Sequence, residues 1–175
     1  MSFLGAVRVS LDEQAPARDG RTRVWPRRYT GSMPDYDFTR PALTADVVAI
    51  ATGGEPRVLL IRRGNPPFEG QWALPGGFVD EWEPPEDAAR RELAEETGLA
   101  YDGTLTIVGV YGERGRDPRG WTVSAAYLAV LGDEAEVDGG DDAAEARWFP
   151  VSELPALGFD HDLIVADALA VLGGR

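Results

Sequence analysis

Three glutamates lie close together in one short predicted helix. Residues 85–97 read PEDAARRELAEET, begin with proline and are followed by Gly98, which predicts a helix with these bounds. At 3.6 residues per turn, Glu92, Glu95 and Glu96 share one face of this helix. Carboxylates held this closely raise one another's proton affinity, so the simplest explanation is a divalent cation between them.

The same pattern also has an explanation without a metal, in which Arg90 and Arg91 form ion pairs on a solvated helix face. The wider sequence favours the metal. Its pattern is Gly, five residues, Glu, seven residues, Arg-Glu-aliphatic, one residue, Glu-Glu, one residue, Gly-aliphatic. This resembles the Nudix box, the signature of the Nudix hydrolases. The matching residues are Gly77, Glu83, Arg91, Glu92, Leu93, Glu95, Glu96, Gly98 and Leu99.

The resemblance implies a metal site and a reaction. The expected ligands are the carboxylates of Glu92, Glu95 and Glu96 and the backbone carbonyl of Gly76, and the expected metal is Mg²⁺ or Mn²⁺, which prefer oxygen ligands. The metal would neutralise phosphate charge and activate a water that attacks phosphorus in line, without a covalent intermediate. The resemblance therefore implies hydrolysis of a phosphate–phosphate bond, with Glu95 and Glu96 among the catalytic residues.

Other residues of the box are expected to support the ligands. Arg91 and Glu83 resemble partners that orient the carboxylates, and we count Arg91 among the catalytic residues. Gly77 is expected to let the backbone approach the metal, and Gly98 to form a left-handed helix exit.

A general base is expected outside the box, because family members often take it from a loop before a later strand. Here that loop is GGDDAAEARW, residues 139–148. Asp142 is the first candidate, followed by Asp141 and Glu145. An acidic surface turn is the alternative explanation for each of them.

Sequence stretches around the box suggest the substrate. They resemble a bacterial group of ADP-ribose pyrophosphatases within the Nudix family, which implies cleavage of ADP-ribose to AMP and ribose 5-phosphate. Oxidised nucleoside triphosphates are the alternative substrates. The stretches are YDFTRPALTADVV (36–48), LLIRRGNPPFEGQWALPGGFV (59–79), RDPRG (116–120) and DHDLIVADAL (160–169).

Four arginines and one tryptophan are candidate substrate-binding residues. Arg62, Arg63, Arg116 and Arg119 could make bidentate contacts with phosphates or ribose, and Trp72 could stack on a base. The alternatives are solvated strand ends for the arginines and ordinary core packing for the tryptophan.

Composition excludes several kinds of chemistry. Among 175 residues there is no cysteine and one histidine, which excludes thiol nucleophiles, disulfides and multi-histidine zinc sites. The formal net charge of −13 disfavours a nucleic-acid partner, although arginines and a metal can still hold a small anionic nucleotide. His161 is expected to pack at a helix start or in a dimer contact, with catalytic use as the alternative.

The order of predicted elements indicates a mixed α/β sheet flanked by helices, and the resemblance implies the Nudix-type α/β/α sandwich with its catalytic strand-loop-helix unit. Residues 1–41 are expected to be an N-terminal extension, and residues 42–175 the hydrolase domain. Besides the helix at 85–97, we predict a hairpin from 43–51 and 57–63, a short glycine-interrupted strand at 72–79, strands at 104–113, 121–131 and 146–150, and a helix at 161–172.

No leader or membrane span is expected from the sequence, so the expected location is the cytoplasm. The resemblance further implies a homodimer. A non-catalytic ADP-ribose sensor is the competing hypothesis. Such sensors need a DNA-reading module, usually after the Nudix domain, and no basic helical segment follows here.

Overall fold

The computed structural model describes residues 15–16, 22–23, 39–140 and 143–174. The chain divides into two compact units, Met1–Thr39 and Arg40–Arg175. In the first unit, strands β1 (Ala15–Pro16) and β2 (Thr22–Arg23) pair in antiparallel fashion. All other described helices and strands belong to the second unit.

The second unit is built on a mixed sheet in the order β5-β4-β3-β8-β7, with β6 paired to β3 and β9 paired to β4. Strands β3 and β8 run parallel over their whole lengths, and every other pair is antiparallel. The strands are β3 (Ala42–Ala51), β4 (Arg57–Arg63), β5 (Trp72–Ala73), β6 (Gly76–Phe78), β7 (Thr106–Tyr111), β8 (Thr122–Leu131) and β9 (Ala143–Pro150).

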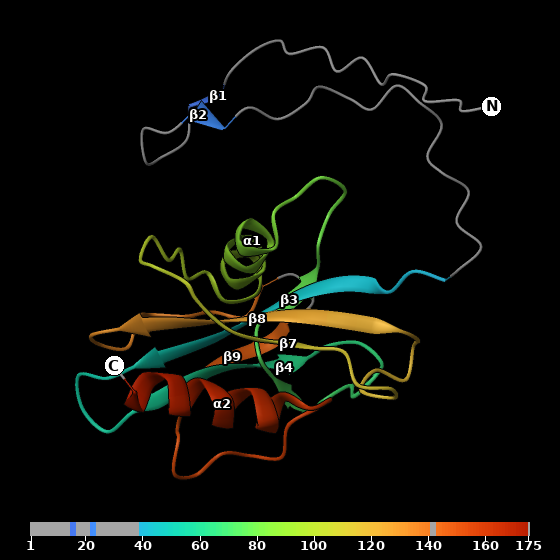
Figure 1. Ribbon diagram of the computed structural model, residues 1–175. Helices are drawn as coiled ribbons and strands as arrows, with labels where there is room; N and C mark the ends of the chain where they lie inside the picture. The colour runs from blue at the N-terminus through green and yellow to red at the C-terminus, as the bar shows by residue number, and fades with distance from the viewer. Residues whose placement is uncertain (1–14, 17–21, 24–38, 141–142, 175) are drawn as a thin grey trace, which may run out of the picture. The chain divides into compact units, whose positions relative to one another are not determined.

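Two helices cover opposite faces of this sheet, α1 (Pro85–Thr97) on one and α2 (His161–Gly173) on the other (Figure 1). Strand β3 is apolar throughout its second half because both of its faces are covered. Val47 and Ala49 join the core that includes residues of α1, whereas Val48 and Ile50 join the core that includes residues of α2. The predicted sandwich of a mixed sheet between helices is thus confirmed.

Helix α1 has the predicted bounds. Pro85 stands in its first turn, where the missing N–H costs nothing. Gly98 ends the helix with a φ of 70°, and its N–H donates to the carbonyl of Ala94 at 2.9 Å. A left-handed residue at this position favours glycine, which explains why the helix stops there.

The segment 72–79 forms two short strands where the sequence predicted one. Strand β5 pairs with β4, whereas β6 pairs with β3, so the segment crosses between two neighbours in the sheet. Pro75 lies at the crossing, where it has no N–H for a ladder bond, but its carbonyl accepts the N–H of Val47 at 2.9 Å. This crossing places Gly76 and Gly77 between β3 and α1.

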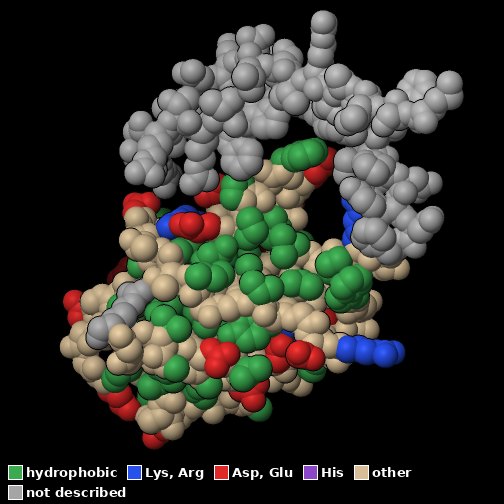
Figure 2. Space-filling view, viewed as in Figure 1, with side chains coloured by type: hydrophobic (Ala, Val, Ile, Leu, Met, Phe, Trp, Pro, Cys, Tyr) green, Lys and Arg blue, Asp and Glu red, His purple; other side chains and the backbone are tan. Residues whose placement is uncertain are grey.

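Hydrophobic side chains gather on the middle of the face shown in Figure 2. Strand β7 is an edge strand of the sheet, and its side chains Ile107 and Val110 are exposed. Within the described residues, neither helix is long and apolar enough to span a membrane.

Candidate active site

Arg91 of α1 is the centre of the carboxylate cluster. Its Nε and Nη2 donate to the two oxygens of Glu83 at 2.9 and 2.8 Å, and its Nη1 donates to Glu92 at 2.6 Å and to Glu95 at 3.1 Å. Nη2 also reaches the carbonyl of Phe78 at 3.0 Å. The bond from Arg91 lowers the pKa of Glu83. One guanidinium thus fixes three carboxylates and the end of β6.

Glu96 is the buried carboxylate of the cluster, with 7% of its surface exposed. Its Oε2 accepts the backbone N–H of Gly76 at 2.9 Å. Burial raises the pKa of Glu96 to about 8, and the negative charges of Glu92 and Asp46 add to the shift. Burial also raises the pKa of Glu92. These groups would gain from a positive charge placed among them.

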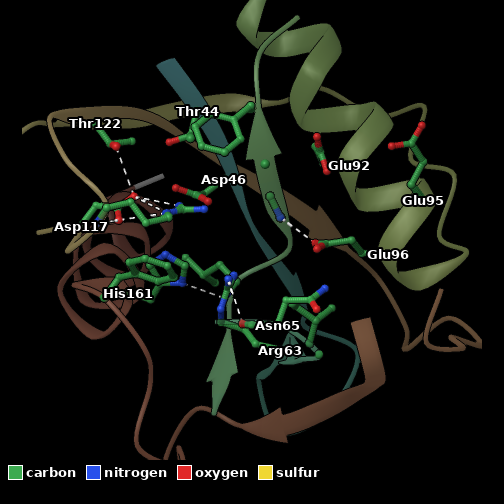
Figure 3. Close-up of a pocket in the computed structure, with 18 of the residues that line it drawn as sticks. Thr44, Asp46, Arg63, Asn65, Glu92, Glu95, Glu96, Asp117, Thr122 and His161 are labelled. Carbon is green, nitrogen blue, oxygen red and sulfur yellow. Dashed lines mark hydrogen bonds and ion pairs between the residues drawn. The ribbon is translucent and has the colours of Figure 1, made fainter. Parts of the chain in front are cut away.

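The two glycines of β6 allow the carboxylates of Glu92 and Asp46 to lie close to the backbone of this strand. A Cβ on Gly77 would lie 2.4 Å from the carboxylate carbon of Glu92, and a Cβ on Gly76 would lie 2.4 Å from Oδ1 of Asp46. No larger residue fits at either position without moving a carboxylate. Because of this close approach, Glu92 and Glu96 lie against β6, whereas Glu95 lies further out (Figure 3).

The donor set fits a hard divalent cation. It consists of oxygen atoms only, and it contains two carboxylates with raised pKa values beside a strand of small residues. Within the described part of the chain, no three acidic or histidine side chains are gathered closely enough to form a complete metal site. In this arrangement the positive group between Glu92 and Glu95 is the guanidinium of Arg91.

These carboxylates line one side of a pocket of about 310 Å³. On the other side of β6 lie Thr44 and Asp46 of β3, together with Asp117, Thr122 and His161 (Figure 3). Asp46 is buried and accepts the hydroxyl of the buried Ser124. Neither Asp46 nor Thr44 was predicted from the sequence, although an acidic residue inside the apolar segment LTADVVAIA is a signal for Asp46.

Three of the four predicted arginines line this pocket. Arg63 comes from the end of β4, and Arg116 and Arg119 come from the loop between β7 and β8. Arg116 is paired with Asp160, to which it donates two hydrogen bonds of 2.8 and 2.7 Å, and only 5% of its side chain is exposed. Arg119 donates to Asp117 but keeps 41% of its side chain exposed. Arg63 donates through its Nε to the carbonyl of Pro67 at 2.7 Å. Of Arg116 and Arg119, the more exposed Arg119 is better placed to meet a ligand.

Three other predicted residues do not line the pocket. Arg62 points away from it because side chains alternate along β4, and its neighbours Ile61 and Arg63 take the pocket side. Trp72 packs edge to face on Phe149 at 4.7 Å, in the core beside α2. Glu145 of β9 instead accepts a bond from Arg147. The first two candidates for the general base, Asp142 and Asp141, lie outside the described residues.

His161 is buried at the first residue of α2 and lines the pocket. Its Nδ1 accepts the backbone N–H of Leu74 at 2.9 Å, so this nitrogen carries no proton. Burial lowers the pKa of His161, which favours the neutral ring. The side chain therefore joins the start of α2 to the segment that leads into Gly76.

Comparison with protein families identifies the family to which this fold belongs. The NUDIX domain model matches residues 40–168. The chain belongs to the Nudix family. The match covers both the carboxylate helix of this Nudix domain and the strands that form the other side of its pocket.

Two similar proteins have names that refer to ADP-ribose. The chain is 43% identical over 131 residues to an ADP-ribose pyrophosphatase of Methanocaldococcus jannaschii, covering 74% of each protein. Together with the family match, this relative supports a pyrophosphohydrolase activity for the Nudix domain. The chain is also 33% identical to an ADPR responsive transcriptional repressor, NtrR, of Acinetobacter baylyi, over 79% of this chain and 57% of the repressor.

A solved structure gives the same connection. The Nudix domain of Shewanella oneidensis NrtR, complexed with ADP ribose, matches with a TM-score of 0.71 and 32% identity. The match covers 79% of this chain and 94% of that domain. The Nudix fold predicted from the sequence is therefore shared with a protein that binds this nucleotide.

Proposed function

We propose that this Nudix hydrolase cleaves ADP-ribose to AMP and ribose 5-phosphate, and that the reaction requires Mg²⁺ or Mn²⁺. The observation that carries the proposal is a single pocket lined both by the carboxylates of α1 and by Arg63, Arg116 and Arg119. Carboxylates suit a divalent cation, and arginines suit the oxygens of a diphosphate. Similarity to an ADP-ribose pyrophosphatase supports the choice of substrate.

Each residue has a distinct part in this proposal. Glu92, Glu95, Glu96 and the carbonyl of Gly76 hold the cation. When bound, the cation neutralises phosphate charge and makes a water more acidic. The other residues supporting the reaction are Arg91 and Glu83, which orient the glutamates, Gly77, which lets Glu92 approach β6, and Arg63 and Arg119, which bind the phosphates.

For the general base we propose Asp142, with Asp141 and Glu145 as the weaker candidates. The described residues just before Asp142 support this choice, because the N–H of Gly140 donates to the carbonyl of Glu96 at 3.1 Å. Gly140 therefore lies beside Glu96, near the C-terminal end of α1. An Asp142→Asn variant with undiminished kcat would reassign the base.

A substrate panel tests the proposal. Purified protein is incubated with Mg²⁺ and with ADP-ribose, NADH, diadenosine polyphosphates or 8-oxo-dGTP, and the products are separated by chromatography. We expect the highest kcat/KM for ADP-ribose, with AMP and ribose 5-phosphate as the products. A clear preference for a nucleoside triphosphate would overturn the substrate assignment and leave the reaction type in place.

An ADP-ribose sensor without turnover is the second candidate, favoured by the similarity to the NtrR repressor. The two candidates differ in one result, because a sensor binds ADP-ribose and releases no AMP. The complete set of box carboxylates supports the hydrolase, since binding alone does not require a metal-activated water.

We further propose a cytoplasmic homodimer that acts on small nucleotides. The exposed Ile107 and Val110 on the edge strand β7 support an apolar contact between subunits. Light scattering should give twice the chain mass of 18.9 kDa. A value equal to one chain would remove the dimer from the proposal.

A further inference from the structure

The segment 157–161 runs along the segment 68–74 and is fastened to it by the backbone. Leu157 forms a bridge with Trp72, and the N–H of Gly158 donates to the carbonyl of Trp72 at 2.8 Å. Gly158 leaves little space at this contact, because a Cβ there would lie 3.1 Å from Cβ of Phe68. The two segments therefore hold each other in place beside the pocket.

Two phenylalanines meet where these segments touch. Phe68 has a φ of 61° and Phe159 a φ of 58°, which is a left-handed conformation that bulky residues rarely adopt. Their rings lie edge to face with centroids 4.7 Å apart. The two strained residues thus meet in one ring contact, and of this pair Phe159 lines the pocket.

The Phe159 ring gathers two cations from different parts of the chain. The guanidinium of Arg63 lies 5.0 Å from the ring centroid. That of Arg119 lies between two rings, 5.7 Å from the centroid of Phe159 and 5.1 Å from that of Phe78. Both arginines line the pocket, as does Phe159. Two positive side chains repel each other, and the negative face of an aromatic ring partly offsets this repulsion.

Neighbouring contacts fix the ring. His161 stacks on Phe159 with centroids 5.1 Å apart, and its Nδ1 is bonded to the backbone of Leu74. Asp160 holds Arg116, and thereby the loop that carries Arg119, through its two charged hydrogen bonds. Residues 159–161 thus connect three separate parts of the pocket wall.

We propose that Phe159 is a positioning residue, which holds Arg63 and Arg119 as a pair that binds the diphosphate of the substrate. This inference rests on the proposed function, since a diphosphate is the ligand that such a pair would meet. Phe159 acts through the arginines and not on the reacting atoms. Its loss should therefore weaken binding more than it slows the chemical step.

The test compares Phe159→Leu with Phe159→Tyr and with a matched control. Phe149→Leu is the control, because Phe149 also packs edge to face on an aromatic ring and lies 5.9 Å from an arginine, but it does not line the pocket. We expect Phe159→Leu to raise KM for ADP-ribose about tenfold while kcat changes less than about threefold. Phe159→Tyr, which keeps an aromatic ring, should have the wild-type KM, and so should Phe149→Leu.

Equilibrium binding of ADP-ribose in EDTA, measured by calorimetry, gives a second readout that does not depend on turnover. Phe159→Leu should bind about tenfold more weakly than wild type, and Phe159→Tyr about as well. Unchanged affinity and KM in Phe159→Leu, with only a lower Tm, would show a purely structural role and overturn the inference. If the wild-type protein binds ADP-ribose but does not cleave it, the proposed function fails and the binding comparison still decides the role of Phe159.

Discussion

Glu96 is the residue on which the proposed chemistry depends most. Replacing it by glutamine keeps its shape and can keep the bond from the N–H of Gly76, but removes the negative charge. We expect Glu96→Gln to reduce kcat for ADP-ribose by on the order of a hundredfold or more. Thermal melting in EDTA should show a Tm no lower than that of wild type, because burial already disfavours the charged carboxylate.

Glu86→Gln is the matched control on the same helix, since Glu86 is exposed and bonds only Arg90 among the described contacts. It should keep wild-type turnover. Full activity in Glu96→Gln would instead rule out a metal-binding role for this carboxylate.

Arg91 affects activity through the carboxylates that it orients. Lysine keeps the positive charge but cannot reach Glu83, Glu92 and Glu95 at once, because it lacks the planar guanidinium. We expect Arg91→Lys to lower kcat/KM by about 10- to 100-fold and to raise the Mg²⁺ concentration needed for half-maximal rate. Arg90→Lys serves as the control, because Arg90 contacts Glu86 and the 101–103 segment. Equal effects of the two substitutions would contradict this role for Arg91.

At the scale of elements, the contact between β6 and α1 decides how closely the carboxylates approach the backbone. In Gly77→Ala, the new Cβ would meet the carboxylate of Glu92, which is the flexible end of a side chain and can move. We therefore expect the fold to persist while Mg²⁺ affinity, measured by calorimetry, falls about tenfold. Gly54→Ala has open space around its Cβ and should change neither quantity. Wild-type Mg²⁺ affinity in Gly77→Ala would show that this contact is unimportant.

Elements with strong local signals could be predicted from the sequence, whereas contacts between loops could not. Proline at the start and glycine after the end predicted α1, and β-branched residues in the segment 43–51 predicted β3. The division of 72–79 into two strands depends on which neighbours are available in the sheet, and no local pattern encodes that choice.

The candidate site shows the same difference. The box residues share one helix face, so their convergence followed from helical periodicity. By contrast, Phe159 lines the pocket and Asp160 holds the pocket residue Arg116 through contacts between residues far apart in the sequence. Arg62 and Arg63 are identical residues at neighbouring positions in the sequence. Only the orientation of β4 in the structure shows which of them lines the pocket.

At the scale of the whole molecule, we propose that residues 1–41 form an extension and that residues 42–175 form the hydrolase domain. Both large core clusters draw their described residues from Ala45 to Leu172. A chain that begins at Arg40 should therefore fold, with a Tm within about 4 °C of the full-length value and similar kcat. Calorimetry and the ADP-ribose assay check this, and an unfolded or inactive product would show that the first unit is required.

Binding of Mn²⁺ tests the central claim, that the glutamates of α1 hold a divalent cation. Free Mn²⁺ is followed by electron paramagnetic resonance while wild-type, Glu96→Gln and Glu86→Gln proteins are titrated. We predict that wild type and Glu86→Gln bind Mn²⁺ with equal affinity and that Glu96→Gln binds at least about tenfold more weakly. Equal binding by all three proteins would contradict the account.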